Sequence, residues 1–122
     1  QAMGIETISL ADTVGVAKEA DISYLFNEVI RKFPKVEFGA HLHTTPGNWL
    51  SKLAAAYDAG CRRFDTAIRG FGGCPMATDK LTGNLATENA VQYLLGKNKN
   101  LTIDIQKLND SILFSNRIFN EH

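Results

Sequence analysis

Apolar and polar residues alternate along VEFGAHLH, residues 36–43. One set of alternate positions is apolar, and the other set consists of Glu37, Gly39, His41 and His43. Successive side chains of a β-strand point to opposite faces, so this alternation predicts a strand with one buried face. The segments 4–13 (GIETISLADT) and 61–68 (CRRFDTAI) are also predicted strands, since both carry β-favouring residues and end near turn or loop residues.

Apolar residues with helical spacing follow each of the first two predicted strands. Between residues 19 and 33 they fall three and one positions apart, which predicts a helix with one apolar face. Pro34 ends this helix, because proline lacks the N–H that a helix interior requires. A second helix is expected to begin at Thr45, as its N-cap, and to end at Gly60 in the C′ position.

The rest of the chain is a long loop followed by two helices. Residues 70–84 include four glycines and one proline, which favours a shaped loop, and loops of this length in compact domains are usually functional. Helices are predicted over residues 86–95 and from residue 104 to the end of the chain. Strands that alternate with helices indicate parallel strands with crossover connections. The expected fold is a single α/β domain over residues 1–122.

Composition excludes several classes of protein. Lysine plus arginine and aspartate plus glutamate each number 13, so no basic field favours nucleic acid or an anionic membrane. No apolar run is long enough to cross a bilayer, and the first residues do not form a signal peptide. We therefore expect a cytoplasmic protein in which Cys61 and Cys74 are reduced thiols.

His41 and His43 are the strongest candidates for a functional site. Residues i and i+2 of a strand share a face, with their Cα atoms roughly 7 Å apart, so two imidazoles can converge on one ion. They also stand near the C-terminal end of their strand, where α/β folds place their sites. The alternative is a pair of half-exposed histidines at a strand end, because two ligands alone do not define a metal site.

Asp12 and Cys74 are further candidates. Asp12 ends the preceding strand and can orient a ligand, bind substrate or cap the next helix. Cys74, in GGCP, is expected on mobile backbone, where a thiol reacts if its pKa is lowered; the alternative is an incidental surface thiol. Cys61 is predicted to be a small buried apolar residue.

Asn84 and Arg69 stand at the two ends of the glycine-rich loop. The amide oxygen of Asn84 suits Mg²⁺ or Mn²⁺, although asparagine is also a common loop and cap residue. Arg69 can pair with a carboxylate or phosphate of a ligand, or equally form a structural salt bridge.

Four motifs together resemble a known family. LADTVGVA, AHLHTT, RGFGGCPMA and TGNLATEN occur in the order found in the C-terminal half of 3-hydroxy-3-methylglutaryl-CoA lyases. The resemblance runs from about residue 4 to about residue 119. A His-x-His pair followed by a glycine loop and Gly-Asn is shared with other metal-dependent lyases and with acyl-CoA condensing synthases on TIM barrels. GGCP is the narrower marker, because isopropylmalate and homocitrate synthases lack that cysteine.

The resemblance implies roles for individual residues. His41, His43 and Asn84 are implied ligands of a divalent metal, Mg²⁺ or Mn²⁺. Cys74 is an implied active-site residue on a flexible loop, and Asp12 lies by the substrate. His41 is also implied in proton handling. The implied activity is cleavage of 3-hydroxy-3-methylglutaryl-CoA to acetyl-CoA and acetoacetate.

The chain departs from the family pattern at two positions. Thr44 stands where the family usually has an acidic or amide residue after the second histidine, which affects hydrogen bonding around the metal site. Arg69 stands where a small residue is usual, which affects the substrate or its binding.

The implied fold is the C-terminal portion of a TIM barrel, with its sixth, seventh and eighth strands. A complete barrel needs about 250 residues and eight strands, and the first strand would supply an aspartate ligand and an arginine. We therefore expect a truncated domain, inactive alone, that binds acyl-CoA together with the missing N-terminal half and associates as a homo-oligomer. The alternatives are an aldolase or condensing synthase acting on 2-oxo acids, and a non-catalytic module with an empty metal site.

Overall fold

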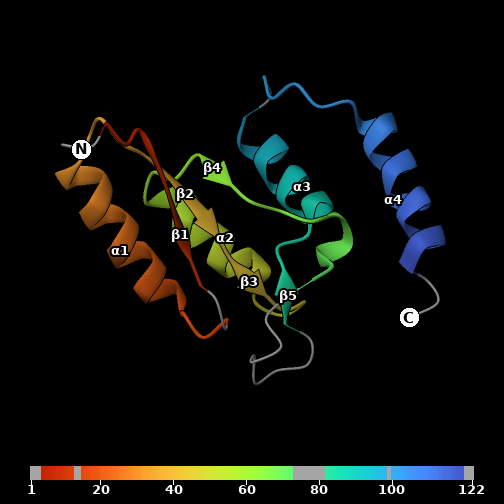
Figure 1. Cartoon of the computed structure of the whole chain (residues 1–122), viewed down its shortest axis with the longest axis horizontal. Helices are drawn as coiled ribbons and strands as arrows, with labels where there is room; N and C mark the ends of the chain where they lie inside the picture. Colours follow the sequence, from red (N-terminus) through yellow and green to blue (C-terminus); the bar gives the residue numbers. More distant parts are fainter. Residues whose placement is uncertain (1–3, 13–14, 73–81, 99, 120–122) are drawn as a thin grey trace.

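A three-stranded parallel sheet organises the molecule (Figure 1). The computed structural model describes residues 4–12, 15–72, 82–98 and 100–119. The strand order is β1-β2-β4, with β1 at Thr7–Ala11, β2 at Glu37–His41 and β4 at Arg63–Phe64. The predicted parallel sheet is confirmed, and its three strands point their carboxyl ends toward the same edge.

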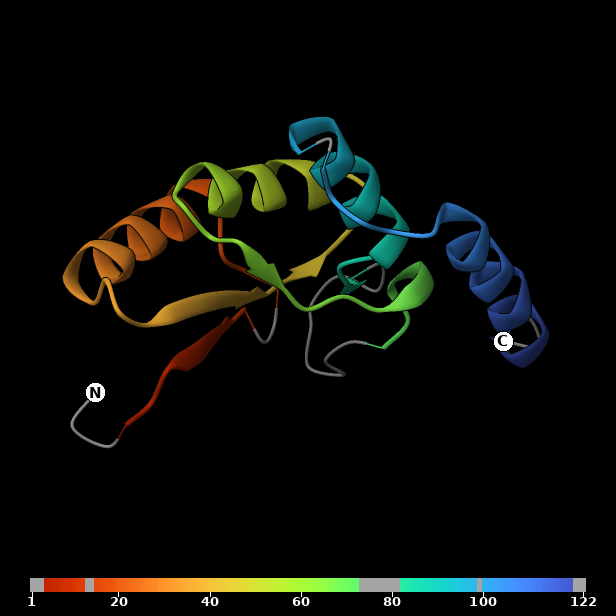
Figure 2. The same ribbon diagram turned by 90° about the horizontal axis from the view of Figure 1, so that it is seen from above.

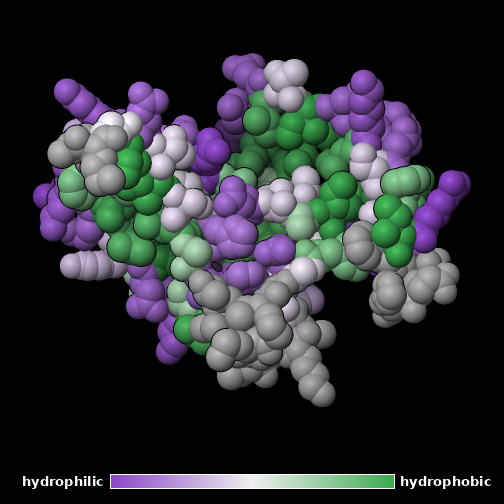
Figure 3. All heavy atoms as spheres, in the orientation of Figure 1, coloured by the Kyte–Doolittle hydropathy of each residue, from purple (hydrophilic) through white to green (hydrophobic). Residues whose placement is uncertain are grey.

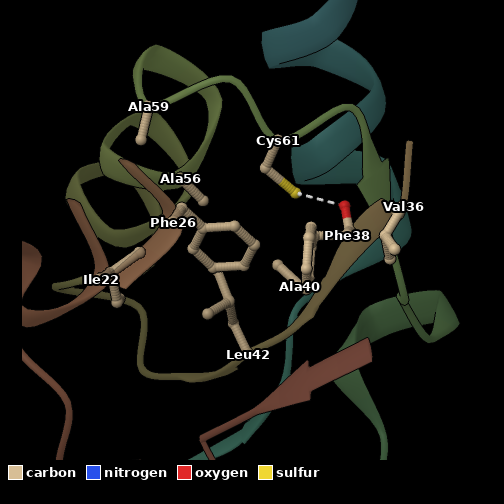
Figure 4. Packing of buried hydrophobic residues seen from close by; sticks show 9 residues of the cluster. All are labelled: Ile22, Phe26, Val36, Phe38, Ala40, Leu42, Ala56, Ala59 and Cys61. Carbon is tan, nitrogen blue, oxygen red and sulfur yellow. Dashed lines mark hydrogen bonds between the residues drawn. The ribbon is translucent and has the colours of Figure 1, made fainter. Parts of the chain in front are cut away.

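Two crossover helices cover one face of this sheet (Figure 2). α1, Glu19–Lys32, joins β1 to β2, and α2, Trp49–Asp58, precedes β4. Figure 4 shows the core between them, in which α1 contributes Ile22 and Phe26. The apolar positions of the alternating segment are all buried in this core, as predicted: Val36, Phe38, Ala40 and Leu42. The alternation of apolar and polar residues therefore predicted correctly which side chains of this segment are buried.

Cys61 is buried in the same core, with 1% of its surface exposed, as the sequence predicted. Its Sγ–H donates to the carbonyl oxygens of Arg63 at 3.2 Å and Phe38 at 3.6 Å. Burial raises the pKa of the Cys61 thiol, chiefly because desolvation disfavours the thiolate.

A pH dependence follows from the raised pKa of Cys61. Unfolding returns the thiol to its ordinary pKa of 9.0, so the native state holds this proton more tightly than the unfolded state. The stability from this group is fully present below pH 9.0 and falls as pH rises through that value. Urea unfolding at a series of pH values should show a steeper alkaline loss of stability in the wild type than in Cys61→Ala. Parallel curves for the two proteins would contradict the effect.

The segment predicted as one strand over residues 36–43 divides at Leu42. β3, His43–Thr44, leaves the parallel sheet and pairs with β5, Gly83–Asn84, in an antiparallel ladder. The expectation that residues 70–84 form only a loop was therefore wrong at its last two positions. The pairing depends on a segment some 40 residues away along the chain, which local patterns do not reveal.

The third predicted strand, residues 61–68, is much shorter than expected. Only Arg63–Phe64 pairs with β2, and Ile68 instead begins the short 3₁₀ helix η1, Ile68–Gly70. Arg69 within η1 has a φ of 58°, in the left-handed region, so the strand geometry cannot continue there.

The start of α2 also differs from the prediction, whereas its end does not. The N-cap is Asn48, not Thr45, because residues 46–48 form a turn in which the Asn48 side chain accepts a hydrogen bond from the Thr45 N–H at 2.7 Å. At the other end, Gly60 has a φ of 107° and donates to Tyr57 O, while Cys61 N–H donates to Ala56 O. This pair of bonds is the helix ending that a C′ glycine predicts.

The last two helices are α3, Thr87–Lys97, and α4, Ile105–Phe119. α3 buries Ala90 and Val91, whereas α4 leaves several large apolar side chains exposed: Ile105, Leu113, Phe114 and Ile118. Figure 3 shows hydrophobic surface both around α1 and β1 and over α4. Among the described helices, none has the length and apolar character needed to cross a membrane.

Candidate metal centre

Polar side chains from three parallel strands meet at the carboxyl edge of the sheet. Ala11 is in register with His41, and Asp12 N–H donates to His41 O at 3.0 Å. On the other side of β2, Asp65 follows the last residue of β4, and its N–H donates to Ala40 O at 3.0 Å. Asp12, His41 and Asp65 are therefore neighbours across the sheet edge, and His43 follows two residues after His41.

The two histidine rings lie side by side. Their centroids are 5.3 Å apart and the ring planes make an angle of 69°. Two imidazoles that bind one ion through nitrogens about 2.1 Å from it have centroids roughly 4.5–5.5 Å apart. The spacing of the rings is therefore compatible with a shared ligand.

Each histidine is held through Nδ1. The Nδ1 of His43 lies 2.7 Å from the carbonyl oxygen of Asp12, which can only accept, so in the neutral ring the proton is on Nδ1 and the lone pair is on Nε2. The Nδ1 of His41 lies 3.2 Å from Oδ2 of Asp65, and a carboxylate partner favours the same tautomer. Histidines that bind metals are commonly held in this way, with the other ring nitrogen donating to a carboxylate or a backbone carbonyl.

Asn84 stands opposite His43 in the ladder of β3 and β5. Its Nδ2 donates to Phe71 O at 2.8 Å, which identifies the nitrogen end of the amide. The Oδ1 atom accepts no hydrogen bond from the described residues, and it belongs to a residue that stands opposite His43 in the ladder. Oxygen and imidazole donors suit Mg²⁺ and Mn²⁺, and the three predicted ligands therefore fit such an ion chemically.

The described residues do not complete a metal site. No group of three or more histidine, cysteine, aspartate or glutamate side chains lies close enough to hold an ion within that part of the chain. The ligand roles of His41, His43 and Asn84 therefore stay predictions.

The backbone before β5 packs closely around Asn84. Gly72 has a φ of 88°, and its carbonyl accepts from the Asn84 N–H at 3.2 Å. A Cβ atom at Gly72 would come within 2.9 Å of Asn84 Nδ2, so only glycine fits this approach. Cys74, two residues further on, falls outside the described residues, and its predicted active-site role stays a prediction.

Both carboxylate oxygens of Asp12 are engaged within the chain. Oδ1 accepts from the Ala17 N–H at 3.2 Å, just before α1, and Oδ2 lies 2.5 Å from Lys52 Nζ. Lys52 also donates to the carbonyl oxygens of His43 at 2.8 Å and Gly15 at 3.4 Å. These contacts do not cap α1, because Ala17 lies before the N-cap of that helix, but through Lys52 the carboxylate is linked to the carbonyl of the predicted ligand His43. The place of Asp12 beside the substrate, and so its catalytic role, stays a prediction.

Sequence reasoning did not identify Lys52 or Asp65. Lys52 lies four residues before the buried Ala56, so its position on the inner face of α2 was visible in the helical period. Asp65 ends β4 as Asp12 ends β1, and this equivalence was the signal that could have identified it.

Thr44 and Arg69, the two departures from the family pattern, border the same hollow. A cavity of about 220 Å³ is lined by both residues and by Asn84, whereas neither histidine lines it. Thr44 is buried, and the Arg69 guanidinium donates to Asn116 Oδ1 of α4 and lies over the ring of Phe71. In the part of the chain that the structure describes, Arg69 forms no salt bridge, so that expectation is not met there.

The contact between Asp65 and His41 predicts an effect on metal binding. Asp65→Ala should weaken binding of Mn²⁺ by about 10- to 100-fold, because the ring of His41 loses the partner that fixes its tautomer and orientation. Stability should change little, since 46% of the Asp65 side chain is exposed. Calorimetric titration with Mn²⁺ measures the effect, and Asp58→Ala, at the exposed end of α2, is the matched control. Equal affinities for the two variants would show that Asp65 does not support His41.

Comparison with known proteins identifies the family. The family model described as HMGL-like matches residues 1–112. The chain belongs to the HMGL-like family. It is 35% identical over 106 residues to the cytoplasmic 3-hydroxy-3-methylglutaryl-CoA lyase of Rattus norvegicus, covering 87% of this chain and 31% of that protein. It is also 35% identical to the (R)-citramalyl-CoA lyase of Chloroflexus aurantiacus, and that match covers 87% of this chain and 33% of that protein.

A solved structure shares the arrangement of elements. An HMG-CoA lyase from Acinetobacter baumannii, in complex with coenzyme A and 3-methylmalate, superimposes with a TM-score of 0.72 at 36% identity. The match covers 88% of this chain and 35% of that one. This α/β chain with its parallel sheet therefore corresponds to part of an HMG-CoA lyase structure. It spans about a third of the length of the curated relatives that it matches.

Proposed function

We propose that this HMGL-like chain forms the C-terminal part of a TIM-barrel lyase that cleaves 3-hydroxy-3-methylglutaryl-CoA with a divalent metal. The observation that carries the proposal is the pair of adjacent imidazoles, each held through Nδ1 by a neighbouring strand end. The Nε2 atoms of His41 and His43 and the Oδ1 of Asn84 would hold Mg²⁺ or Mn²⁺. The bound ion would stabilise negative charge on the hydroxyl and carboxylate oxygens of the substrate.

The proposed reaction is a retro-aldol cleavage. A base removes the proton of the tertiary hydroxyl at C3, the C2–C3 bond breaks, and its electron pair forms the enolate of acetyl-CoA. An acid then protonates C2, and acetoacetate is the second product. The proposed part of Cys74 is to stand near this carbon on its loop, a role that rests on the resemblance.

Two roles are considered for His41, binding of the metal and removal of the substrate proton, and both would use the same nitrogen, Nε2. The Nδ1 of His41 lies against Asp65, so Nε2 cannot both bind an ion and take the proton of the substrate. We therefore assign Nε2 to the metal. With Nδ1 protonated and Nε2 on the ion, His41 would have no free lone pair for the substrate proton, and its part in proton handling rests on the resemblance alone.

Titration with Mn²⁺ tests the metal site in the chain itself. The wild type should bind one ion, and His41→Ala/His43→Ala should bind none in calorimetry. His122→Ala removes the third histidine of the chain and is the matched control, which should bind as the wild type does. Binding by the double variant, or no binding by the wild type, would leave the alternative of a non-catalytic module with an empty site.

The proposed partners are an acyl-CoA substrate and the part of a barrel that this chain does not include. Within the described residues β1 pairs only with β2, and four of its five residues are exposed. An open strand edge of this kind pairs readily with another chain. We expect the isolated chain to associate and to lack turnover of the thioester. A compact monomer in size-exclusion chromatography would contradict association, and turnover would contradict inactivity.

A second candidate is carbon–carbon chemistry on a 2-oxo acid, as in aldolases and condensing synthases. Two observations favour a substrate other than 3-hydroxy-3-methylglutaryl-CoA: the equal identity to a citramalyl-CoA lyase, and the position of Arg69 in the lining of the cavity that Asn84 also borders. The chain loaded with Mn²⁺ should bind 3-hydroxy-3-methylglutarate more tightly than pyruvate in calorimetry. The reverse order would favour the second candidate.

A further inference from the structure

Lys52 is a buried cation whose contacts converge on the candidate metal centre. Its side chain is 2% exposed, although it belongs to a helix whose outer face is open to water. Burying an ammonium is costly unless its donors are satisfied. The ammonium of Lys52 has three N–H donors and three oxygen partners: Asp12 Oδ2, His43 O and Gly15 O.

Two of the residues that Lys52 contacts, His43 and Asp12, also form a hydrogen bond with each other. His43 provides the ring whose Nδ1 donates, and Asp12 provides the carbonyl oxygen that accepts, at 2.7 Å. Lys52 holds the carbonyl of His43 at 2.8 Å and the carboxylate of Asp12 at 2.5 Å. The Lys52 ammonium therefore holds the backbone of His43, the donor, in place relative to Asp12, the acceptor.

We propose that Lys52 is a positioning residue that fixes the tautomer and the orientation of the His43 ring. The ammonium joins three segments, α2, the residues after β1, and β3, and keeps the Asp12 carbonyl within reach of Nδ1. With Nδ1 protonated in the neutral ring, the lone pair is on Nε2, and the hydrogen bond at Nδ1 holds the ring in one orientation. The consequence for metal binding rests on the proposed function, whereas the effect on the ring does not.

A role in stability alone would give a different result. A lysine that only stabilises the fold would change the free energy of unfolding, and any variant that still folds would keep the His43 ring as it is. Lys52→Met keeps the length of the side chain and removes the charge, but it leaves the Asp12 carboxylate buried. Asp12→Asn/Lys52→Met removes both charges and so retains the test if the single variant does not fold.

The measurement is a long-range ¹H–¹⁵N correlation spectrum of the histidine rings in the metal-free chain. The wild type should show neutral His43 protonated at Nδ1, and both variants should show a mixture of tautomers. Lys35→Met, which replaces an exposed lysine, is the matched control and should give the wild-type spectrum. His43 retained in one tautomer in either folded variant would overturn the proposal.

A second readout separates this inference from the proposed function. If the chain binds Mn²⁺, both variants should bind it about 10- to 100-fold more weakly than Lys35→Met does. A change of tautomer without any binding by the wild type would support the role of Lys52 and refute the metal site. A third test uses the wild type alone. The Lys52 ammonium protons should exchange slowly with water, and an ammonium that exchanges freely would refute the contacts on which the inference depends.

Discussion

Asp12→Ala should lower the free energy of unfolding by about 3–5 kcal/mol, because it leaves a buried ammonium without its counter-ion. Asp12 and Lys52 side chains are 8% and 2% exposed, so water cannot replace the lost carboxylate without disturbing the fold. Small domains have a total stability of about 5–15 kcal/mol, and the variant should therefore be partly unfolded at modest urea concentrations. Circular dichroism during urea unfolding measures the change.

The double variant Asp12→Asn/Lys52→Met is the control for this effect. Replacing both members of a buried pair by neutral groups of similar volume is often close to neutral, so the double variant should be more stable than Asp12→Ala. A loss of less than about 1 kcal/mol in Asp12→Ala would indicate a pair screened by water and worth no more than a surface salt bridge.

Phe26→Ala should also destabilise the chain, by about 3–5 kcal/mol, because it opens a cavity in the core between α1 and β2. Phe26 is 2% exposed and packs among residues from both crossover helices and the central strand (Figure 4). The same urea experiment measures this loss. Tyr24→Ala, on the outer face of α1 with 62% of Tyr24 exposed, is the matched control and should lose much less. Similar losses in the two variants would contradict the assigned inner face of α1.

The features predicted well from the sequence are those that short stretches of chain determine. The alternation over residues 36–43 identified the buried side chains of β2, since side-chain direction has a period of two in any strand. Gly60 marked the end of α2 because few other residues adopt its φ of 107°. Cys61 was correctly expected to be buried.

The features that were missed depend on contacts between distant segments. The short ladder of β3 and β5 exists only because residues 83–84 return to His43 and Thr44. The third strand shortens to Arg63–Phe64 as the chain turns into η1. No pattern within residues 61–68 or 70–84 specifies either event.

In the candidate site, too, the sequence predicted the features set by nearby residues and missed those set by distant segments. The spacing of His41 and His43 indicated two imidazoles on one side, and their centroids lie 5.3 Å apart. The groups that hold these rings, Asp65 and the Asp12 carbonyl, come from other strands and needed the sheet register to be recognised. Lys52 was overlooked because a lysine in an exposed helix is normally solvated, and only its oxygen partners explain its burial.

Pulsed electron paramagnetic resonance of the Mn²⁺-loaded chain, with ¹⁵N-labelled histidine, tests directly whether one ion is held by both imidazoles. We expect hyperfine couplings from two histidine nitrogens, with one coupling lost in His41→Ala and one in His43→Ala. A wild type that shows only one histidine coupling, unchanged in His43→Ala, or no histidine coupling at all, would contradict the shared site on which the proposed lyase function depends.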